Sequence, residues 1–502
     1  MGNLEGLIKG FKPKRTFACS HSKIEVDGVF ARVPSEGEND SWKEVDILTD
    51  ADCRGYYLIK IEDLLQDPAI IRSARVSTGR DTKEVDEKAQ GLVNFLWRDH
   101  HVTPSEGAVV VRTKWTMPIM YAQPIFRLFG SHNEFSGRYS VIGDEYYTPD
   151  FENNANADLF KKEFNDAGFE AKILYNNLLK LGVAKEMARY VHLYRFYTKF
   201  YFTVSLRHLL EFLLIDENSE NRHQSTEFWK IKDPVKELLK HWTPWAFGSF
   251  ENNPRPLNFN WAKEISSRYS CFLFDQLGNK LWNERNKVLD HGCIELIGSN
   301  SNTDMVLAGL NDFPDPTKAL NHGSMSFFVR MPIHVFRQWV RHRSLCFSEL
   351  EIDFDKIVED GLFYVPDRFR KQTGKVGQYI FEDMDDTENN VVRELLIKHI
   401  ESCKDRYVRL RDCGLSMQLA ALNLPYVFYI DTLLTAPLGG LANFLSLRTD
   451  SHAQKEIGDY AFLIWNMFKA KNPVVAELFV KNMYHGDSEK INNFRFFPEI
   501  GP

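Results

Sequence analysis

The sequence predicts an α+β protein made of two tandem copies of one domain, each a small sheet packed with several helices. Three observations carry this prediction. The chain has 502 residues, more than one hydrophobic core usually supports. Landmark segments of the first half recur in the same order in the second half. In both halves a strand-like run ends near a proline and is followed by a helix-like pattern.

The repeat is visible as an ordered series of matching segments. Met117-Pro118-Ile119 corresponds to Met331-Pro332-Ile333, and residues 209–213 correspond to residues 441–445. The separation changes slowly along the first part of the series, from 214 residues at Pro118 and Pro332 to 217 residues at Pro149 and Pro366. Chance can supply one such match but not an ordered series, so we infer a duplication.

Each copy is expected to combine strands with helices. Residues 109–115 and 325–329 are strand-like and lie just before Pro118 and Pro332. Proline suits the first turn of a helix because it has no N–H group to leave unpaired. A strand followed by a helix is therefore expected at both prolines.

Two helices of the second copy have clear apolar sides. The helix from Pro332 should bury Val335, Phe336, Trp339 and Val340. Its polar side, by spacings of three and four residues, carries Arg337, Gln338 and Arg341. Near the C-terminus, Ser451 and Gln454 predict a capping box. The helix that follows should bury Ile457, Tyr460, Ile464 and Phe468.

These patterns divide the chain into four parts. Residues 1–50 have no counterpart in the second half and are assigned to an N-terminal extension, and residues 51–250 to the first domain. Residues 251–290 begin with the linker-like sequence Glu-Asn-Asn-Pro-Arg-Pro and continue as a helical insertion over 261–290. Residues 291–502 form the second domain.

Composition narrows the classes of function. Hydrophobic residues make up 43% of the chain and charged residues 26%, as is ordinary for a globular protein. The formal net charge of −7 argues against a coat for nucleic acid or anionic membrane, so neither partner is expected. The seven cysteines have no CxxC pair or zinc-ligand spacing, which predicts reduced thiols, no metal site and a cytoplasmic protein. Cys346 is expected to be a small buried core residue.

Two short basic motifs indicate local anion sites. Arg341-His342-Arg343 places two fixed cations and a titratable ring at the end of an amphipathic helix. Guanidinium groups suit phosphate and the carbonyl edge of a pyrimidine or flavin. A solvated basic face would be the simpler interpretation of this triplet alone. In the matching region of the first copy, however, Gly137 lets the backbone approach a ligand closely and Arg138 offers its guanidinium to phosphate.

The combined pattern resembles the flavin-dependent thymidylate synthases. It consists of Arg-Gln-Trp-x-Arg-His-Arg at 337–343, Asn-Glu-x-Ser-Gly-Arg-Tyr-Ser at 133–140 and Phe-Leu-x-Leu-Arg-x-Asp-Ser-His-Ala-Gln at 444–454. The resemblance covers most of residues 70–250 and 291–485. It implies an enzyme whose FAD takes a methylene group from methylenetetrahydrofolate to C5 of dUMP, while NADPH supplies the reducing equivalents. Members of the family are homotetramers with sites at subunit junctions.

The resemblance assigns site residues to both copies. It implies that Arg448 is catalytic, because the matching arginine of relatives binds the uracil edge and favours negative charge on the ring. The implied dUMP-binding residues are Glu134, Phe135, Ser136, Gly137, Arg138 and Arg189 in the first copy and Gln338 and Arg341 in the second. The implied FAD-binding residues are Ser77, Thr103, Glu106, Ser205 and Arg207 in the first copy and Arg341, His342 and Arg343 in the second. Ser205 stands where the family usually has asparagine.

The two copies depart from the family pattern in complementary places. The first copy has Phe126-Arg127-Leu128 in place of Arg-His-Arg, and Asp216 where the second copy has Arg448. The second copy has Glu351-Ile352-Asp353 in place of Ser-Gly-Arg, and these carboxylates would repel a phosphate. The interface at which the conserved motifs of both copies meet therefore keeps every ligand-binding residue, and this junction is expected to form an active site. The reciprocal junction, where the altered motifs meet, is expected to be inactive, and we call it the dead junction. Two chains are expected to form a homodimer that reproduces the family tetramer.

Other functions stay open. One is a flavin- and folate-dependent deoxypyrimidine nucleotide hydroxymethylase, which the departure at Ser205 leaves possible. Another is a non-catalytic nucleotide-binding scaffold, which is less favoured because it predicts scattered losses, whereas the losses here follow the two sites. The sequence does not decide between dUMP and another deoxypyrimidine nucleotide, or between a working site within one chain and one shared by two chains.

Overall fold

A computed structural model describes two compact units. Unit 1 consists of Met1–Ser136, Glu145–Asp150 and Arg195–Trp261, and unit 2 of Gly137–Asp144, Phe151–Tyr194 and Ala262–Pro502. The described residues are 16–18, 23–29, 70–71, 74, 87–98, 110–125, 130–138, 140–143, 145–151, 154–214, 232–252, 292–300, 306, 309, 316–350, 352–375, 378–450, 453–482, 484 and 491. Several residues named in the sequence analysis lie outside them, namely Ser77, Thr103, Glu106, Phe126-Arg127-Leu128, Asp216, the insertion at 261–290, Glu351 and Ser451.

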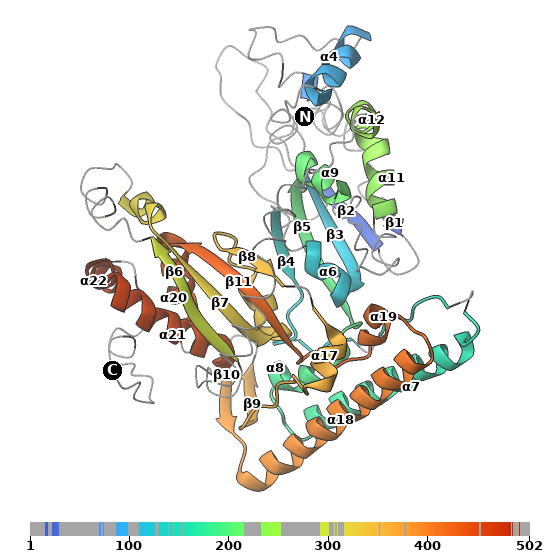
Figure 1. The fold of residues 1–502 in the computed structure, drawn as a ribbon, viewed down its shortest axis with the longest axis vertical. Coiled ribbons are helices and arrows are strands. Elements are labelled where there is room, and N and C mark those ends of the chain that lie inside the picture. The colour runs from blue at the N-terminus through green and yellow to red at the C-terminus, as the bar shows by residue number, and fades with distance from the viewer. Residues whose placement is uncertain are drawn as a thin grey trace. The chain divides into compact units, whose positions relative to one another are not determined.

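Unit 1 is built on a five-stranded antiparallel sheet (Figure 1). In order across the sheet, its strands are β1 (Thr16–Ala18), β2 (Lys23–Val29), β3 (Val110–Pro118), β5 (Tyr197–Ser205) and β4 (Gly130–Glu134). Alternate side chains of β5 are buried, as expected for a strand with one face on a core. The helices of the unit are α4 (Glu87–Arg98), α6 (Ile119–Ile125), α9 (Leu206–Leu214), α11 (Lys232–Trp242) and α12 (Pro244–Asn252).

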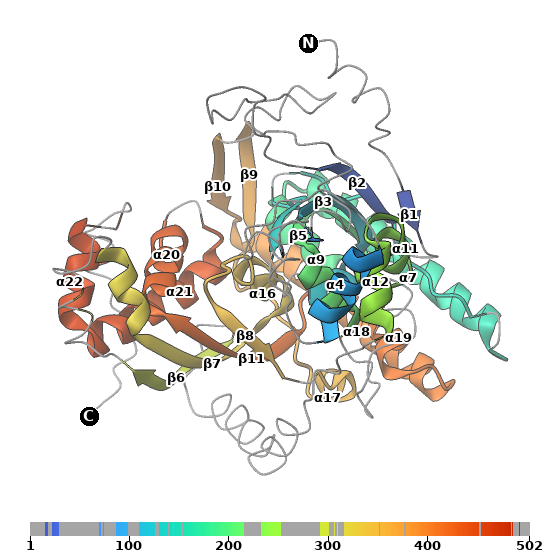
Figure 2. The same cartoon turned by 90° about the horizontal axis from the view of Figure 1, so that it is seen from above.

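Unit 2 contains a second antiparallel sheet and a layer of helices. In order across the sheet, its strands are β6 (Cys293–Asn300), β7 (Ser324–Pro332), β11 (Tyr429–Pro437) and β8 (Cys346–Glu349). Figure 2 shows α20 (Leu438–Arg448), α21 (Lys455–Lys471) and α22 (Pro473–Asn482) along one face of this sheet. The buried side chains of α20 and α21 include Leu441, Phe444, Ile457 and Trp465, which form the core under the sheet.

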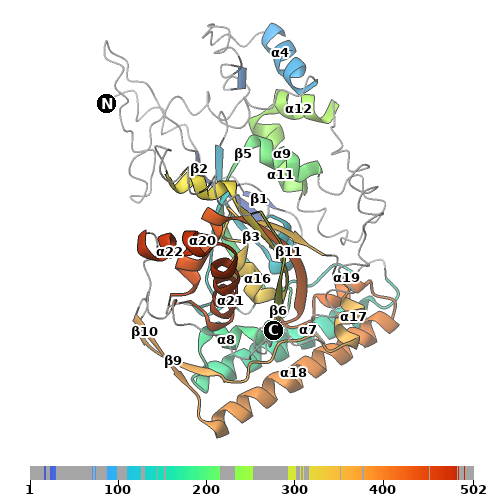
Figure 3. The same ribbon diagram turned by 60° about the vertical axis from the view of Figure 1, so that its left-hand side comes forward.

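The rest of unit 2 is mainly helical. Two long helices, α7 (Ala157–Lys180) and α18 (Asp386–Asp412), lie side by side in Figures 1 and 3. The shorter elements are α8 (Lys185–Ala188), η1 (Arg189–Val191), η2 (Pro316–His322), α16 (Ile333–Trp339), α17 (Phe354–Glu359) and α19 (Met417–Ala421). A two-stranded hairpin, β9 (Arg370–Lys375) and β10 (Gln378–Asp383), precedes α18.

The two sheets have the same topology. The order β2-β3-β5-β4 in one corresponds to β6-β7-β11-β8 in the other. The registers also correspond, because Pro118 pairs with Tyr197 and Pro332 pairs with Tyr429. The predicted α+β class with repeated domains is confirmed. Strand β2 lies in the residues assigned above to an N-terminal extension, yet it occupies the position that β6 has in the second sheet, with a register shift at Gly28 that corresponds to the one at Gly298.

Unit 2 joins segments from both halves of the chain around a local two-fold arrangement. The Tyr194 amide donates to the Leu424 carbonyl at 2.9 Å, and the Tyr426 amide donates to the His192 carbonyl at 2.8 Å. These residues are equivalent in the two copies, 232 positions apart, so the two hydrogen bonds are a reciprocal pair of the kind found at a dimer axis. A first-copy helix therefore packs on its second-copy equivalent within one chain, and Arg406 of α18 forms ion pairs with Glu163 and Glu170 of α7.

Two local predictions need correction. The apolar residues predicted for α16 and α21 are buried, but α21 begins at Lys455 with Gln454 as its N-cap, so the predicted capping box is wrong. The Gln454 side chain does not serve the helix end, because it is hydrogen-bonded to residues of other elements. Cys346 is exposed rather than buried, since it opens the short strand β8 at the edge of the sheet.

No helix in the described ranges is both long and apolar enough to cross a membrane.

Candidate active site

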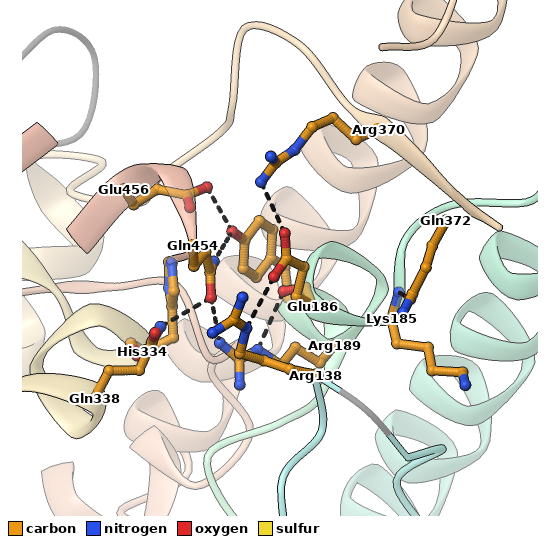
Figure 4. Close-up of polar contacts among 11 residues, drawn as sticks. Arg138, Lys185, Glu186, Arg189, His334, Gln338, Arg370, Gln372, Gln454 and Glu456 are labelled. Atoms are coloured by element: carbon orange, nitrogen blue, oxygen red, sulfur yellow. Dashed lines mark hydrogen bonds and ion pairs between the residues drawn. The ribbon is translucent and has the colours of Figure 1, made fainter. Parts of the chain in front are cut away.

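Three arginines surround one buried carboxylate in unit 2. Glu186 lies on the short helix α8 and is 1% exposed. Its Oε2 accepts from Nε of Arg138 at 2.9 Å and its Oε1 from Nη2 of Arg370 at 2.7 Å (Figure 4). Arg189, one helical turn further on, donates from Nε to the Glu186 carbonyl at 3.1 Å. The carboxylate holds together like charges that would otherwise repel one another, and the cluster carries a net charge of +2.

Gln454 connects the first-copy arginine to second-copy residues. Its Oε1 accepts from Nη2 of Arg189 at 2.9 Å and from Nε2 of Gln338 at 2.8 Å. Its Nε2 donates to the Tyr190 hydroxyl at 2.9 Å, and that hydroxyl donates to Glu456 Oε1 at 2.7 Å. Burial, and then the nearby Glu456, raise the pKa of Tyr190, so this hydroxyl keeps its proton. Figure 4 shows these side chains converging from both halves of the chain.

The directions of these hydrogen bonds fix how Gln338 is presented. A guanidinium cannot accept a hydrogen bond, so the oxygen of Gln454 must face Arg189. The nitrogen of Gln338 must then face that oxygen, and it also donates to the His334 carbonyl at 3.3 Å. Gln338 Oε1 is left buried, with no hydrogen-bond partner among the residues that the structure describes. Such an acceptor is costly unless a ligand or water satisfies it.

The Arg-His-Arg motif follows α16 and adjoins Gln338. His342 is 6% exposed, and burial followed by the charge of Arg448 lowers the pKa of His342 to about 3. The ring is therefore neutral at ordinary pH, and its Nε2 accepts from Nε of Arg448 at 3.0 Å. Nη2 of Arg448 also lies 3.5 Å from the Gln338 carbonyl. Arg341 and Arg343 are exposed on either side of the buried ring.

The remaining first-copy candidates lie in unit 1, except for Gly137. Glu134, at the end of β4, accepts from the Thr198 hydroxyl at 2.6 Å, and the Phe135 side chain is 44% exposed. Ser136 is half-buried. Ser205 ends β5 and contacts His208 at 2.8 Å, and Arg207 lies in the first turn of α9 and contacts Glu211 at 2.8 Å. Gly137, in unit 2, is closely packed: an added Cβ would lie 2.6 Å from the end of the Ile142 side chain, which would have to shift.

Some of the predicted site residues are thus brought together within unit 2. Arg138 and Arg189 of the first copy share Glu186, and Arg189 reaches Gln338 of the second copy through Gln454. Sequence reasoning missed five members of the network: Glu186, Tyr190, Arg370, Gln454 and Glu456. A signal existed for Gln454, which closes the Asp-Ser-His-Ala-Gln motif. No group of side chains in the described ranges has the composition of a metal site.

Three buried histidines of unit 2 predict loss of stability in acid. Burial lowers the pKa of His342 and His192 to about 3 and that of His399 to about 4. Unfolded histidine titrates near pH ~6.5, so below that pH the unfolded chain binds more protons than the folded one. The free energy of unfolding should therefore be at its maximum above this pH. Below it, the free energy of unfolding should decrease by up to about 1.4 kcal/mol per pH unit for each histidine.

Urea denaturation at stepped pH measures this effect. His399→Gln should lower the slope because it removes one of the buried rings whose pKa burial lowers. An identical pH profile in wild type and His399→Gln would show that the buried ring does not contribute.

Comparison with known proteins identifies the family. A family model described as thymidylate synthase complementing protein matches residues 61–245 and again 302–474, once in each half. The chain therefore belongs to this family, with two family domains in tandem. A flavin-dependent thymidylate synthase of Thermosipho africanus is 36% identical over 166 residues, which are 33% of this chain and 72% of the relative. An enzyme of the same name from Thermus thermophilus is 34% identical over 206 residues, which are 38% of this chain and 74% of the relative.

Solved structures also align with the chain. A UMP/dUMP methylase, PolB, of Streptomyces cacaoi bound with 5-Br dUMP matches 37% of this chain and 90% of its own, at 23% identity and a TM-score of 0.33. The membership of the flavin-dependent thymidylate synthase family expected from the sequence is confirmed by the family model and the relatives, and with it the prediction of an enzyme.

Proposed function

We propose that the chain methylates dUMP to dTMP with FAD, NADPH and methylenetetrahydrofolate, at a composite site made of first-copy and second-copy residues. The observation that carries this proposal is the hydrogen-bond path from Arg189 through Gln454 to Gln338. It joins the phosphate-binding arginines of one copy to the base-binding side chains of the other within one chain. The position of the Arg-His-Arg motif beside Gln338 supports the same arrangement.

The arginine cluster suits the phosphate end of the nucleotide. Arg138 and Arg189 are held in place by Glu186 before any ligand arrives. Preorganised guanidinium groups lose little side-chain entropy on binding, and their planar forks match phosphate oxygens. A net charge of +2 on the cluster balances the charge of about −2 on a phosphate monoester at neutral pH.

The base-facing groups favour uracil over cytosine. Gln338 presents an unpartnered acceptor, and the N3–H of uracil is a donor that would satisfy it. Cytosine in the same register would place the lone pair of N3 against that oxygen. The amide cannot simply rotate to suit cytosine, because its nitrogen is used by Gln454 and by the His334 carbonyl. This polarity supports dUMP rather than dCMP as the substrate.

Gln454→Ala tests the fixed amide. Without Gln454, only the His334 carbonyl orients Gln338, so its amide can present either atom to the base. The ratio of the dissociation constants for dCMP and dUMP is expected to fall by about tenfold, the equivalent of one hydrogen bond of ~1.4 kcal/mol. Calorimetric titration with both nucleotides measures the ratio. Gln418→Ala on α19, a glutamine outside the network, is the matched control. If Gln454→Ala weakened the binding of dUMP and dCMP equally, Gln454 would have a structural role and no role in base selection.

Arg448 is the residue that we place in the chemistry. Its guanidinium is oriented by the neutral His342 ring, which is itself packed against Phe444. A fixed cation beside the uracil ring would stabilise the negative charge that makes C5 nucleophilic. Because this electrostatic activation needs no covalent attack by the protein, Cys346 is not required as a nucleophile.

The donor groups of the second copy fit a flavin cofactor. Exposed Arg341 and Arg343 flank the buried, neutral His342, a set that suits a pyrophosphate and the carbonyls of a flavin ring. When bound, FAD would supply electron transfer and carry the one-carbon unit. By resemblance, Ser77, Thr103, Glu106, Ser205 and Arg207 of a first copy would complete this site. We assign no residues to NADPH or to the folate.

Flavin stoichiometry tests the division of labour between copies. Because only one kind of junction keeps the ligand-binding residues, we expect about one tightly bound FAD per chain rather than two. Two tandem chains would then form the assembly of four family domains. Titration of the apoprotein with FAD, followed by fluorescence, measures the number of sites. Saturation at two equivalent sites per chain would refute the hypothesis that the dead junction binds no FAD.

The product itself tests the proposed reaction. Purified protein with dUMP, methylenetetrahydrofolate, NADPH and FAD should form a nucleotide with the mass of dTMP. A product with the mass of a hydroxymethyl nucleotide would identify the hydroxymethylase instead. No turnover, with dUMP and FAD both bound, would favour the binding scaffold.

A further inference from the structure

We propose that the hairpin β9–β10 supplies a third guanidinium, Arg370, to the phosphate of the nucleotide. This inference rests on the proposed function for the identity of the ligand, but its evidence is separate. It concerns a segment that only the second copy has. The short segment before α7 in the first copy comprises residues 151–156, whereas the second copy has residues 368–385, which contain the hairpin.

The hairpin is docked on first-copy residues beside Glu186. The Ala184 amide donates to the Arg370 carbonyl at 2.7 Å, and Val183 forms an antiparallel bridge with Lys371. The Lys185 amide donates to Gln372 Oε1 at 3.0 Å. Both the main chain and the side chain of Arg370 are therefore tied to the segment that carries Glu186 (Figure 4).

The Arg370 guanidinium is oriented and still has donors to offer. Nη2 bonds Glu186, and the group lies over the Phe381 ring at 5.3 Å from its centroid. Among the described residues it makes no other hydrogen bond, which leaves Nε and Nη1 available. The side chain is 20% exposed, so it is partly shielded from water yet accessible. A guanidinium held in this way by a buried carboxylate, next to two others, is preorganised for an oxyanion.

Charge explains why a third arginine is useful. Arg138 and Arg189 with Glu186 alone would have a net charge of +1, whereas Arg370 raises it to +2. The second pKa of a phosphate monoester is near ~6, so the cluster with Arg370 is matched to the dianion. We therefore assign Arg370 the role of selecting the doubly charged 5′-phosphate.

The test compares Arg370→Ala with Arg370→Lys and with the control Arg368→Ala. Arg368 lies at the base of the same hairpin but pairs with the exposed Asp386. Arg370→Ala should weaken dUMP binding by at least about tenfold, with Arg370→Lys between it and wild type and Arg368→Ala unchanged. Deoxyuridine, measured by competition, should bind equally well to all four proteins. Wild-type affinity for dUMP should also rise with pH through ~6, and this rise should shrink in Arg370→Ala.

A double variant separates contact with phosphate from mere neutralisation of Glu186. If Arg370 served only to balance that carboxylate, Glu186→Gln combined with Arg370→Ala would restore dUMP affinity, which would overturn the proposal. We expect the double variant to stay weak. Equal loss for dUMP and deoxyuridine in Arg370→Ala would also overturn it.

Inorganic phosphate distinguishes this proposal from the proposed function. It should raise the melting temperature of wild type more than that of Arg370→Ala, whatever base the site accepts. Stabilisation by phosphate without dUMP binding would refute the proposed substrate and keep the anion site. Binding of dUMP that depends on Arg138 but not on Arg370 would refute the role of the hairpin alone.

Discussion

Arg138→Ala is expected to raise the dissociation constant for dUMP by about a hundredfold, because losing charge-assisted hydrogen bonds to phosphate at a shielded site costs about 2–3 kcal/mol. The side chain is 12% exposed and is held by Glu186. Once it is gone, Glu186 keeps only Arg370 as a side-chain partner among the described contacts, so the cluster loses both a ligand for phosphate and one positive charge. Calorimetric titration measures the affinity, and initial rates should show an increase in KM for dUMP.

Asp353→Ala is the matched control for this variant. Asp353 is the second-copy residue at the position of Arg138, and it caps α17 by accepting from the Lys356 amide at 3.0 Å. Its replacement should cost about 1 kcal/mol of stability, as for other N-caps, and leave dUMP affinity unchanged. Weak dUMP binding in a folded Asp353→Ala protein would show that the junction considered dead has a function.

The repeat and its strands were accessible from the sequence because they depend on local patterns. The strand before Pro332 and the apolar side of α16 follow from periodicity, and both are present. The place of β2 was missed, although β2 and β6 share the pattern Ile-Glu-x-x-Gly at Ile24 and Ile294. The two strands are 270 positions apart, far from the separation of 214 at Pro118 and Pro332, so the match falls outside the ordered series, and the role of β2 is set by pairing with β3. Register between distant strands leaves little trace in a single sequence.

The site shows the same limit more sharply. Residues in the family pattern, such as Arg189 and Gln338, could be named beforehand, but the residue that links them could not be given its role. The sequence favours a helix cap for Gln454, since a cap is a common local use of a polar residue before a helix. Its actual partners lie 116 and 265 positions away. The contribution of Arg370 depends on the docking of an insertion, which no repeat comparison could reveal.

Arg448→Ala should chiefly lower kcat, by about a hundredfold or more, because its contact with the uracil ring strengthens as negative charge develops there. Affinity for dUMP should change less than in Arg138→Ala. Single-turnover rates with saturating dUMP measure the effect. Arg409→Ala, which removes an exposed arginine of α18 paired with Glu163, is the control and should keep full activity. Loss of dUMP binding in Arg448→Ala without loss of single-turnover rate would place this arginine in binding rather than in catalysis.

Mixing Arg138→Ala chains with Arg448→Ala chains should not restore activity. Arg138 reaches Arg448 through Glu186, Arg189, Gln454 and Gln338, and every link of this path belongs to unit 2 of a single chain. Each mixed assembly therefore has one defect in every working site. A site shared between chains would instead combine an intact Arg138 with an intact Arg448 in some assemblies, and activity would return after unfolding and refolding the mixture. Each variant refolded together with wild type is the control, and its activity should follow the wild-type fraction. Recovery in the doubly mutant mixture would mean that the working site is assembled from two chains.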